Sequence, residues 1–181
     1  GLGDVYKRQA CVSLVADARK LAGDGGVVGL RQGDALQVGS FDLQTVWPER
    51  FSDEGGNADS LCLVADADID GDGASEWRAL FTGDAERDQL RALIDEGLVD
   101  SVDLYKVGHH GSKNALDDEE AAVLSPRIAL VSAGARNRYG HPAQDTLDRL
   151  EAAGARVFRT DEQGDVSCKL TADRIEVDTL R

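Results

Sequence analysis

The chain has 181 residues, 41% hydrophobic and 30% charged, a size that suits one domain with a sizeable core rather than two. Its 34 acidic and 20 basic residues give a net charge of −14, which opposes the counterion-release binding used by proteins that coat nucleic acid. An enzyme acting on phosphodiesters is still compatible with this charge, since a bound metal supplies local positive charge. No stretch approaches the roughly 20 consecutive apolar residues of a membrane-spanning helix, so we expect no membrane insertion by this segment.

The chain contains no methionine, so we expect it to be a fragment of a longer protein. Residues 1–9 are polar and aperiodic, and we interpret them as a foreign or disordered leader. Residues 10–181 are then expected to form the C-terminal part of a single domain. The cysteines Cys11, Cys62 and Cys168 are odd in number and far apart, which favours buried small hydrophobic residues over a disulfide framework or a CxxC metal site.

The predicted elements change character along the chain. Apolar residues recur at helical spacing from Cys11 to Ala22, where Gly23 ends the pattern. Four predicted strands follow, over residues 35–38, 41–46, 60–65 and 77–82, the first two joined by a Gly-Ser turn. Helices are then expected over 85–96, 117–124 and 142–153, the last with Pro142 in its first turn, and strands over 102–107, 128–131 and 156–158. Residues 165–170 and 174–177 read as a closing hairpin. Strands followed by alternating strands and helices predict an α/β (α+β layered) fold, a mixed sheet with helices on the outside.

All three histidines lie in two glycine-bearing segments that follow predicted strands. His109 and His110 come just after the strand over 102–107, and His141 lies in a strand-to-helix loop. Asp84 likewise leaves a strand and precedes a helix. Loops held by rigid strands are favoured for catalysis, and imidazole and carboxylate groups are ligands of Zn²⁺ and Mn²⁺. Asp84 alone would be read as a helix N-cap and His141 alone as a helix-entry hydrogen-bonding residue, but together with the histidine pair they favour a metal site.

Four motifs in this order resemble the metallo-β-lactamase-like domain of ComEC competence proteins and their hydrolase relatives. They are the runs Leu80–Glu86, Asp103–Ser112, Asn137–Pro142 and Arg159–Asp161 with Gly164. Asn57 and Ser60, at the entry to a strand, also resemble the family's Asn-x-x-Ser element and are expected to be substrate or structural loop residues. The resemblance covers the chain from about Ala10 to near its end. Each motif is weak by itself, and the four in order are strong.

The resemblance implies a partial metallo-β-lactamase αββα sandwich, with Asp84 and His141 as metal ligands for one or two Zn or Mn ions. It implies that the histidine pair faces the substrate. His110 is our first choice as the catalytic or phosphate-contacting residue and His109 the second, although the sequence does not separate them. Lys106 either neutralises a phosphate oxygen or faces solvent, with about equal weight. Ser112 is better read as a hydrogen-bonding loop residue than as a nucleophile, since no Gly-x-Ser-x-Gly elbow surrounds it.

The chain departs from the family pattern because it has no HxHxDH-type motif and no histidine before His109. We therefore expect the first ββα half, with its ligands, to lie upstream, and we expect the isolated chain to bind metal weakly and to be inactive. For the parent protein the resemblance implies a metal-dependent phosphodiesterase or nuclease acting in DNA uptake. DNA is then the partner, beside a membrane-channel portion of the same parent chain, at the extracytoplasmic face of a bacterial membrane.

Three alternatives remain open from the sequence. The domain is a soluble hydrolase of another ester or amide, since fold does not fix substrate. It is a non-catalytic interaction module of the uptake channel. Separately, the run from Asp66 to Asp72 resembles a calcium loop, but Trp77 stands at the twelfth position where a bidentate Glu is required, with Glu76 one place short. A solvated acidic connection between two strands is the better interpretation of that run.

Overall fold

The computed structural model describes residues 2–50 and 56–180, and it describes the side chains of these residues except 2–11 and 24. The chain divides into two units, residues 1–30 and 31–181. The first unit consists of helix α1 (Leu2–Ala22) and the short 3₁₀ helix η1 (Asp24–Gly26). The helical backbone thus begins nine residues before the predicted start at Cys11 (11 − 2), and the origin of residues 1–9 stays a prediction. Among the described residues, no helix is both long and apolar enough to cross a membrane.

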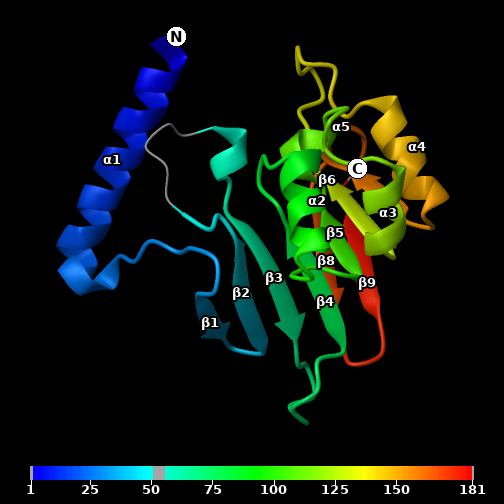
Figure 1. Ribbon diagram of the computed structural model, residues 1–181, viewed down its shortest axis with the longest axis horizontal. Helices are drawn as coiled ribbons and strands as arrows, with labels where there is room; N and C mark the ends of the chain where they lie inside the picture. Colours follow the sequence, from blue (N-terminus) through cyan, green and yellow to red (C-terminus); the bar gives the residue numbers. More distant parts are fainter. Residues whose placement is uncertain (1, 51–55, 181) are drawn as a thin grey trace. The chain divides into compact units, whose positions relative to one another are not determined.

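The second unit is built on a seven-stranded mixed sheet whose strands lie in the same order as in the sequence. Figure 1 shows β1 to β4 side by side in that order. The strands are β1 (Ala35–Val38), β2 (Phe41–Trp47), β3 (Cys62–Ala67), β4 (Trp77–Phe81), β5 (Leu104–Lys106), β6 (Ile128–Val131) and β7 (Arg156–Arg159). The pairs from β1 to β4 are antiparallel and those from β4 to β7 are parallel. The predicted mixed sheet flanked by helices is confirmed.

The change from antiparallel to parallel pairing follows from the connections. A two-residue turn joins β1 to β2, and longer loops join β2 to β3 and β3 to β4. Each parallel step instead carries an α-helix, as a crossover to a parallel strand requires. These helices are α2 (Arg87–Asp95), α3 (Asp118–Leu124) and α4 (Gln144–Ala152). Asp117 caps α3 by accepting the backbone N–H groups of Glu119 and Glu120, which would otherwise lack partners in the first turn. The helix boundaries agree with the predicted ones to within a few residues.

The core lies between the sheet and this helical layer. Leu90 and Leu93 of α2 and Leu150 of α4 join Leu80 and Tyr105 of the sheet in one buried cluster. All five side chains are at most 1% exposed. Each fully buried leucine contributes roughly 1.5–3 kcal/mol relative to an exposed one, so this cluster fixes the sheet and the loops that leave it.

The chain ends in an antiparallel hairpin of β8 (Val166–Leu170) and β9 (Ile175–Thr179), close to the predicted one. The buried indole N–H of Trp77 in β4 donates to the carbonyl oxygen of Thr171 at 2.6 Å, which ties the hairpin turn to the sheet. A one-turn helix α5 (Thr160–Gln163), which the sequence did not predict, directly follows β7.

One prediction at a helix start was wrong. Pro142 was expected in the first turn of its helix, but α4 begins at Gln144 with Ala143 as its N-cap. The reason is a competing contact, because the backbone N–H of Ala143 donates to the carbonyl oxygen of Gly111 at 2.8 Å. This bond joins the loop before α4 to the loop that carries the histidine pair.

A candidate active site at the strand ends

Five loops meet at one edge of the sheet, where the parallel strands have their carboxyl ends. Asp84 follows β4, His109 and His110 follow β5, and His141 lies in the loop between β6 and α4. The helical turn η2 (Asn57–Asp59), which leads into the antiparallel strand β3, lies at the same edge, and α5 follows β7 there. This edge is where ligands bind in open α/β sheets. The predicted site residues are therefore brought to a common edge by strand direction.

The segment that carries the histidine pair has an unusual backbone. His109 has φ 42° and His110 has φ 56°, so two consecutive non-glycine residues adopt the left-handed region inside the short turn η3 (Gly108–Gly111). Such conformations are sparsely populated and cost roughly 1–3 kcal/mol each, although histidine tolerates them better than branched residues. The surrounding packing must hold this turn, and it aims both imidazoles out of the sheet edge.

The glycines on either side of the pair are needed because the backbone comes too close to its neighbours for a side chain. A Cβ at Gly108 would lie 2.5 Å from the carbonyl oxygen of Ala85. Gly111 has φ +75°, and a Cβ there would lie 2.8 Å from the Cβ of Pro142. The Gly-His-His-Gly sequence is thus explained by close contact with the loops after β4 and before α4.

His109 is oriented by a carboxylate that the sequence analysis did not single out. Its Nδ1 lies 2.6 Å from Oε1 of Glu86 and 3.3 Å from Nδ2 of Asn57. A carboxylate only accepts and an amide NH₂ only donates, so the two contacts require opposite protonation of Nδ1. The bond to Glu86 is shorter and charge-assisted, so it outweighs the contact with Asn57. Nδ1 of His109 therefore carries the proton. Among the described residues, Nε2 of His109 has no hydrogen-bond partner.

His110 is held in the same manner by the main chain. Its Nδ1 donates to the carbonyl oxygen of Ser132 at 2.8 Å. Its Nε2 lies 3.5 Å from Oδ1 of Asp84, and both side chains are about half exposed. Asp84 is itself positioned by Ser60, whose Oγ accepts the Asp84 backbone N–H at 3.0 Å. Both histidines therefore present Nε2 outward while Nδ1 is fixed by the protein.

His141 lies beside the pair. Its ring centroid is 5.5 Å from that of His109, in an edge-to-face arrangement. Partial burial lowers the pKa of His141, and repulsion from His109 and His110 lowers it further. A neutral imidazole is the form that accepts a proton or binds a metal, so the environment favours the reactive state.

The side chains of Lys106 and Ser112 both make hydrogen bonds to backbone groups of the protein. Lys106 is half-buried at the end of β5, where its Nζ donates to the carbonyl oxygen of Val107 at 3.1 Å. Burial lowers the pKa of Lys106, and the charge of Asp84 opposes that shift. Ser112 is buried, and its Oγ accepts the backbone N–H of Asn114 at 3.2 Å. Lys106 is thus an inward cation next to Asp84, and the Ser112 hydroxyl serves its own loop.

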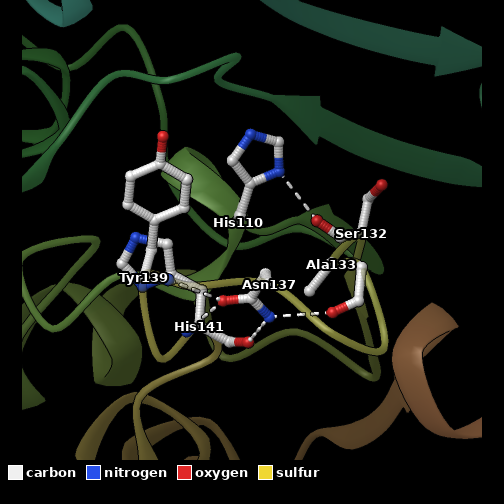
Figure 2. A pocket seen from close by; sticks show the side chains of 7 residues that line it. His110, Ser132, Ala133, Asn137, Tyr139 and His141 are labelled. Carbon is white, nitrogen blue, oxygen red and sulfur yellow. Dashed lines mark hydrogen bonds between the residues drawn. The ribbon is translucent and has the colours of Figure 1, made fainter.

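The loop after β6 contains further side chains that the sequence analysis quoted without giving them roles (Figure 2). Asn137 donates to the carbonyl oxygens of Gly134 and His141 and accepts the backbone N–H groups of Tyr139 and His141. An asparagine shortly before glycine and proline is a signal for such a side-chain-stabilised turn. Thr160 of α5 ties this loop to β7, since its Oγ1 bonds both the N–H and the carbonyl of Ala133 at 2.9 Å.

The residue types at the edge fit a divalent metal in part. Histidines with Nδ1 bonded to a carboxylate or carbonyl and Nε2 free are oriented as metal ligands are. In the described part of the chain, however, no three donor atoms among Asp84 and the histidines lie within 4.8 Å of one another. By themselves these four side chains therefore offer too few converging donor atoms to hold an ion.

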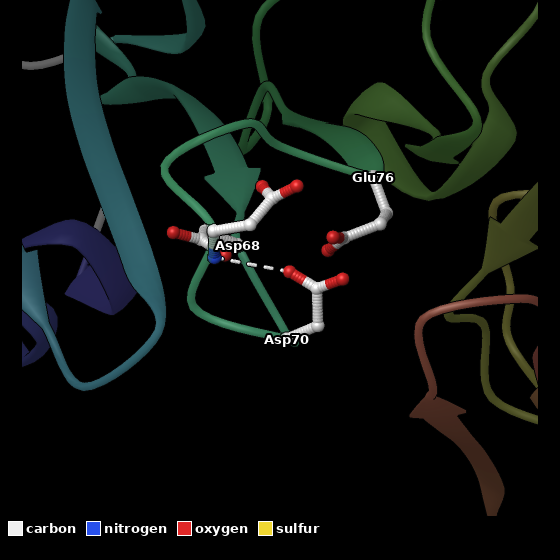
Figure 3. A group of neighbouring side chains, drawn as sticks. Asp68, Asp70 and Glu76 are labelled. Carbon is white, nitrogen blue, oxygen red and sulfur yellow. Dashed lines mark hydrogen bonds between the residues drawn. The ribbon is translucent and has the colours of Figure 1, made fainter.

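The acidic loop between β3 and β4 does bring four carboxylates together (Figure 3). Oxygens of Asp68, Asp70, Asp72 and Glu76 lie within 4.8 Å of one another. Each of these side chains already accepts a backbone N–H of its own loop, and Asp66 pairs instead with Arg78 at 3.4 Å. Glu76 thus joins the cluster although it stands one place short of the calcium-loop position. The interpretation as a solvated acidic connection stays a prediction.

The comparisons with known proteins identify several homologues. The chain is 34% identical over 137 residues to ComE operon protein 3 of Bacillus subtilis, a match that covers 76% of this chain and 17% of that protein. It is 26% identical over 183 residues to Recombination protein 2 of Haemophilus influenzae, which covers all of this chain and 22% of that protein. Competence protein ComA of Neisseria gonorrhoeae is 32% identical over 104 residues, covering 56% of the chain and 15% of that protein. No family model matches the chain. The chain spans less than a quarter of the length of each of these relatives.

Proposed function

We propose that this chain supplies part of a metal-dependent hydrolase domain, directed at phosphodiesters such as those of DNA, in a protein of competence-type DNA uptake. The observation that carries the proposal is the meeting of Asp84, His109, His110 and His141 at one sheet edge, each from a loop that follows a strand. The similarity to a competence protein supports the assignment to DNA uptake. The resemblance to the metallo-β-lactamase-like domain supports the chemistry.

His110 is the proposed proton-transfer residue. Because Nδ1 donates to Ser132, the ring exchanges its second proton at Nε2, the atom that faces Asp84 and solvent. A protonated Nε2 stabilises charge on a phosphate oxygen or protonates the leaving oxygen. Lys106 is close enough to interact electrostatically with Asp84 and adds positive charge near the site. These groups suit a substrate that becomes more negative at the reacting atom.

His109 is the proposed second residue that faces the substrate. Its bond to Glu86 fixes the ring and leaves Nε2 as an acceptor, which is the arrangement of a general base or of a ligand. Glu86 does not touch the substrate in this proposal, and its part is to position His109. Asn57 contacts the same ring from the opposite loop and limits its rotation.

In this proposal Asp84 and His141 are two of the ligands of one or two Zn or Mn ions, and the remaining ligands come from a preceding part of the parent protein. Such an ion would lower the pKa of a bound water and polarise the scissile bond. DNA is the proposed partner, and a channel portion of the same parent is the proposed neighbour at the extracytoplasmic membrane face. The relatives contain long stretches with no counterpart in this chain, and such stretches are long enough to contain the remaining ligands and a channel portion.

The test uses the parent protein with the residues that precede this chain. Cleavage of a fluorescent DNA strand and of a nitrophenyl phosphodiester is measured with Zn²⁺ or Mn²⁺. His110→Ala is expected to lower kcat by about 10²–10⁴-fold. Lys169→Ala, at an exposed position on the closing hairpin, is the control for the effect of substitution itself. An intact parent that cleaves neither substrate with either ion, or a fully active His110→Ala variant, contradicts the proposal.

A further inference from the structure

A cavity of about 250 Å³ opens beside His110 at the candidate site (Figure 2). No carboxylate is found among the described residues that line it, although the chain as a whole carries a net charge of −14. The lining residues are His110, Ser132, Ala133, Gly134, Asn137, Tyr139 and His141. Ligand pockets span about 300–1,000 Å³, so this cavity suits a single ring system rather than a larger group.

Tyr139 stands at the rim of the cavity and is 83% exposed. Its ring lies nearly parallel to that of His141, at an interplanar angle of 15° and a centroid distance of 6.0 Å. Burial therefore does not explain why an aromatic residue stands here. One side of the ring is supported by His141, and most of the remaining surface is open to a flat partner.

The loop that carries Tyr139 is held in place before any ligand arrives. All the hydrogen-bonding atoms of the Asn137 side chain are used within the loop, at distances of 2.6–3.2 Å. Thr160 fixes its start at Ala133. A platform that is already ordered loses less entropy when a ligand binds.

Two cations flank this platform. Arg136 and Arg138 are exposed in the same loop, on either side of Asn137. In the described residues, neither guanidinium lies within 4.0 Å of a carboxylate, whereas Arg78, Arg91 and Arg159 are all paired. Unpaired arginines beside an exposed aromatic ring are the combination that binds single-stranded nucleic acid, with bases on the ring and phosphates on the cations.

We propose that the loop Ala133–Gly140 and the cavity beside it bind single-stranded DNA, with one base stacked on Tyr139 and the flanking phosphates at Arg136 and Arg138. This rests on the proposed function only for the choice of DNA as the ligand. A paired base is stacked inside its duplex and cannot reach the ring without unpairing, so the site selects unpaired strands. The stacked base would then hold the adjoining backbone beside His110.

The experiment measures fluorescence anisotropy of a labelled 12-nucleotide single strand with the purified chain, at low salt and with EDTA so that no metal-dependent cleavage occurs. Tyr139→Ala is expected to weaken binding by about 5- to 100-fold, and Tyr139→Phe by less than about 2-fold, since stacking needs the ring and not the hydroxyl. The double variant Arg136→Gln with Arg138→Gln is expected to weaken binding and to reduce its dependence on salt. Lys169→Gln with Arg174→Gln, which also removes two positive charges, both from residues that pair with Glu176 on the closing hairpin, is the charge control.

An abasic strand separates stacking from charge. It is expected to bind wild type and Tyr139→Ala alike, while a duplex of the same sequence binds more weakly than the single strand. Absence of binding by wild type, equal binding of single strand and duplex, or an unchanged Tyr139→Ala variant each overturns the inference. Because cleavage is not measured, these results stand apart from the test of hydrolysis: a binding chain whose parent is inactive contradicts the proposed function alone.

Discussion

Nδ1 of His109 lies 2.6 Å from Oε1 of Glu86, although the two residues are 23 positions apart (109 − 86) and leave different strands. The bond fixes which ring nitrogen of His109 carries the proton. It also fixes the orientation of the imidazole ring of His109.

Replacement of Glu86 is expected to change the tautomer of His109. In the wild-type chain the neutral ring carries its proton on Nδ1, whereas in Glu86→Ala the amide of Asn57 becomes the nearest partner and favours a proton on Nε2. Long-range ¹H–¹⁵N NMR spectra of the imidazoles distinguish the two forms. Asn57→Ala serves as the control and should leave the Nδ1 tautomer in place; a tautomer that is the same in all three proteins would show that Glu86 does not set it.

Gly108→Ala is expected to destabilise the fold by about 1–3 kcal/mol, because the new methyl group would overlap the carbonyl oxygen of Ala85. Gly56→Ala is the matched control, since no atom of the described residues lies within 4 Å of a Cβ at that position. Its free energy of unfolding should change by less than about 0.5 kcal/mol. Urea denaturation measures both, and equal midpoints for the two variants would refute the explanation given for the Gly-His-His-Gly sequence.

Cys62 is expected to resist thiol reagents in the folded protein. Burial raises the pKa of its thiol to about 12, so at pH 8 almost no thiolate is present, and the thiolate is the reactive form. The thiol belongs to the core, and unfolding returns its pKa to the ordinary range. The folded protein is therefore destabilised relative to the unfolded chain only as the pH rises above about 9, where the unfolded thiol ionises and the folded one does not.

Labelling with an aromatic disulfide reagent tests this in a Cys11→Ser, Cys168→Ser background. The remaining thiol should react at the rate of global unfolding, and faster in urea. Rapid labelling of the native protein at pH 8 would show that Cys62 is accessible.

The isolated chain is expected to bind Zn²⁺ weakly and to cleave no phosphodiester, because Asp84, His110 and His141 do not bring three donor atoms together. Isothermal titration with Zn²⁺ and Mn²⁺ measures the affinity. The experiment uses a chain with Asp68→Asn and Asp70→Asn, because the carboxylates of the acidic loop would otherwise bind cations. Tight binding that survives these two changes, together with cleavage, would mean that the sheet edge is complete without further ligands.

Much of the fold was predictable because the strands are short runs of apolar or alternating residues with turn-forming residues, such as Gly39 and Pro126, near their ends. Residues 35–38 and 128–131 were predicted as strands with the bounds that the structure shows for β1 and β6. Pro142 was misplaced because its position depends on Gly111, a contact between loops that no local pattern encodes. The helix α5 was missed because it has four residues, too few for a periodic signal.

The sequence predicted which loops carry the candidate site residues, but it did not predict which side chains those residues contact. Strand direction sufficed to bring Asp84, the histidine pair and His141 to one edge. The roles of Glu86 and Tyr139 depend on side-chain orientation, because one is a carboxylate that reaches a neighbouring loop and the other a ring that stacks on His141. Sequence spacing alone carries no information on either.

The order of the sheet has a consequence for how the chain folds. Every strand from β1 to β7 pairs with its immediate neighbour in the sequence, so no pairing has to wait for a distant segment. The longest gap between paired strands runs from Val131 to Arg156, and α4 shortens it by forming locally. A strand order that pairs only sequence neighbours avoids the closure of longer loops, whose entropic cost rises with their length. The sheet can therefore grow strand by strand in the direction of synthesis. The carbonyl of Gly111, at the end of the histidine turn, gains its hydrogen bond from Ala143 only when the chain has grown by a further 32 residues (143 − 111).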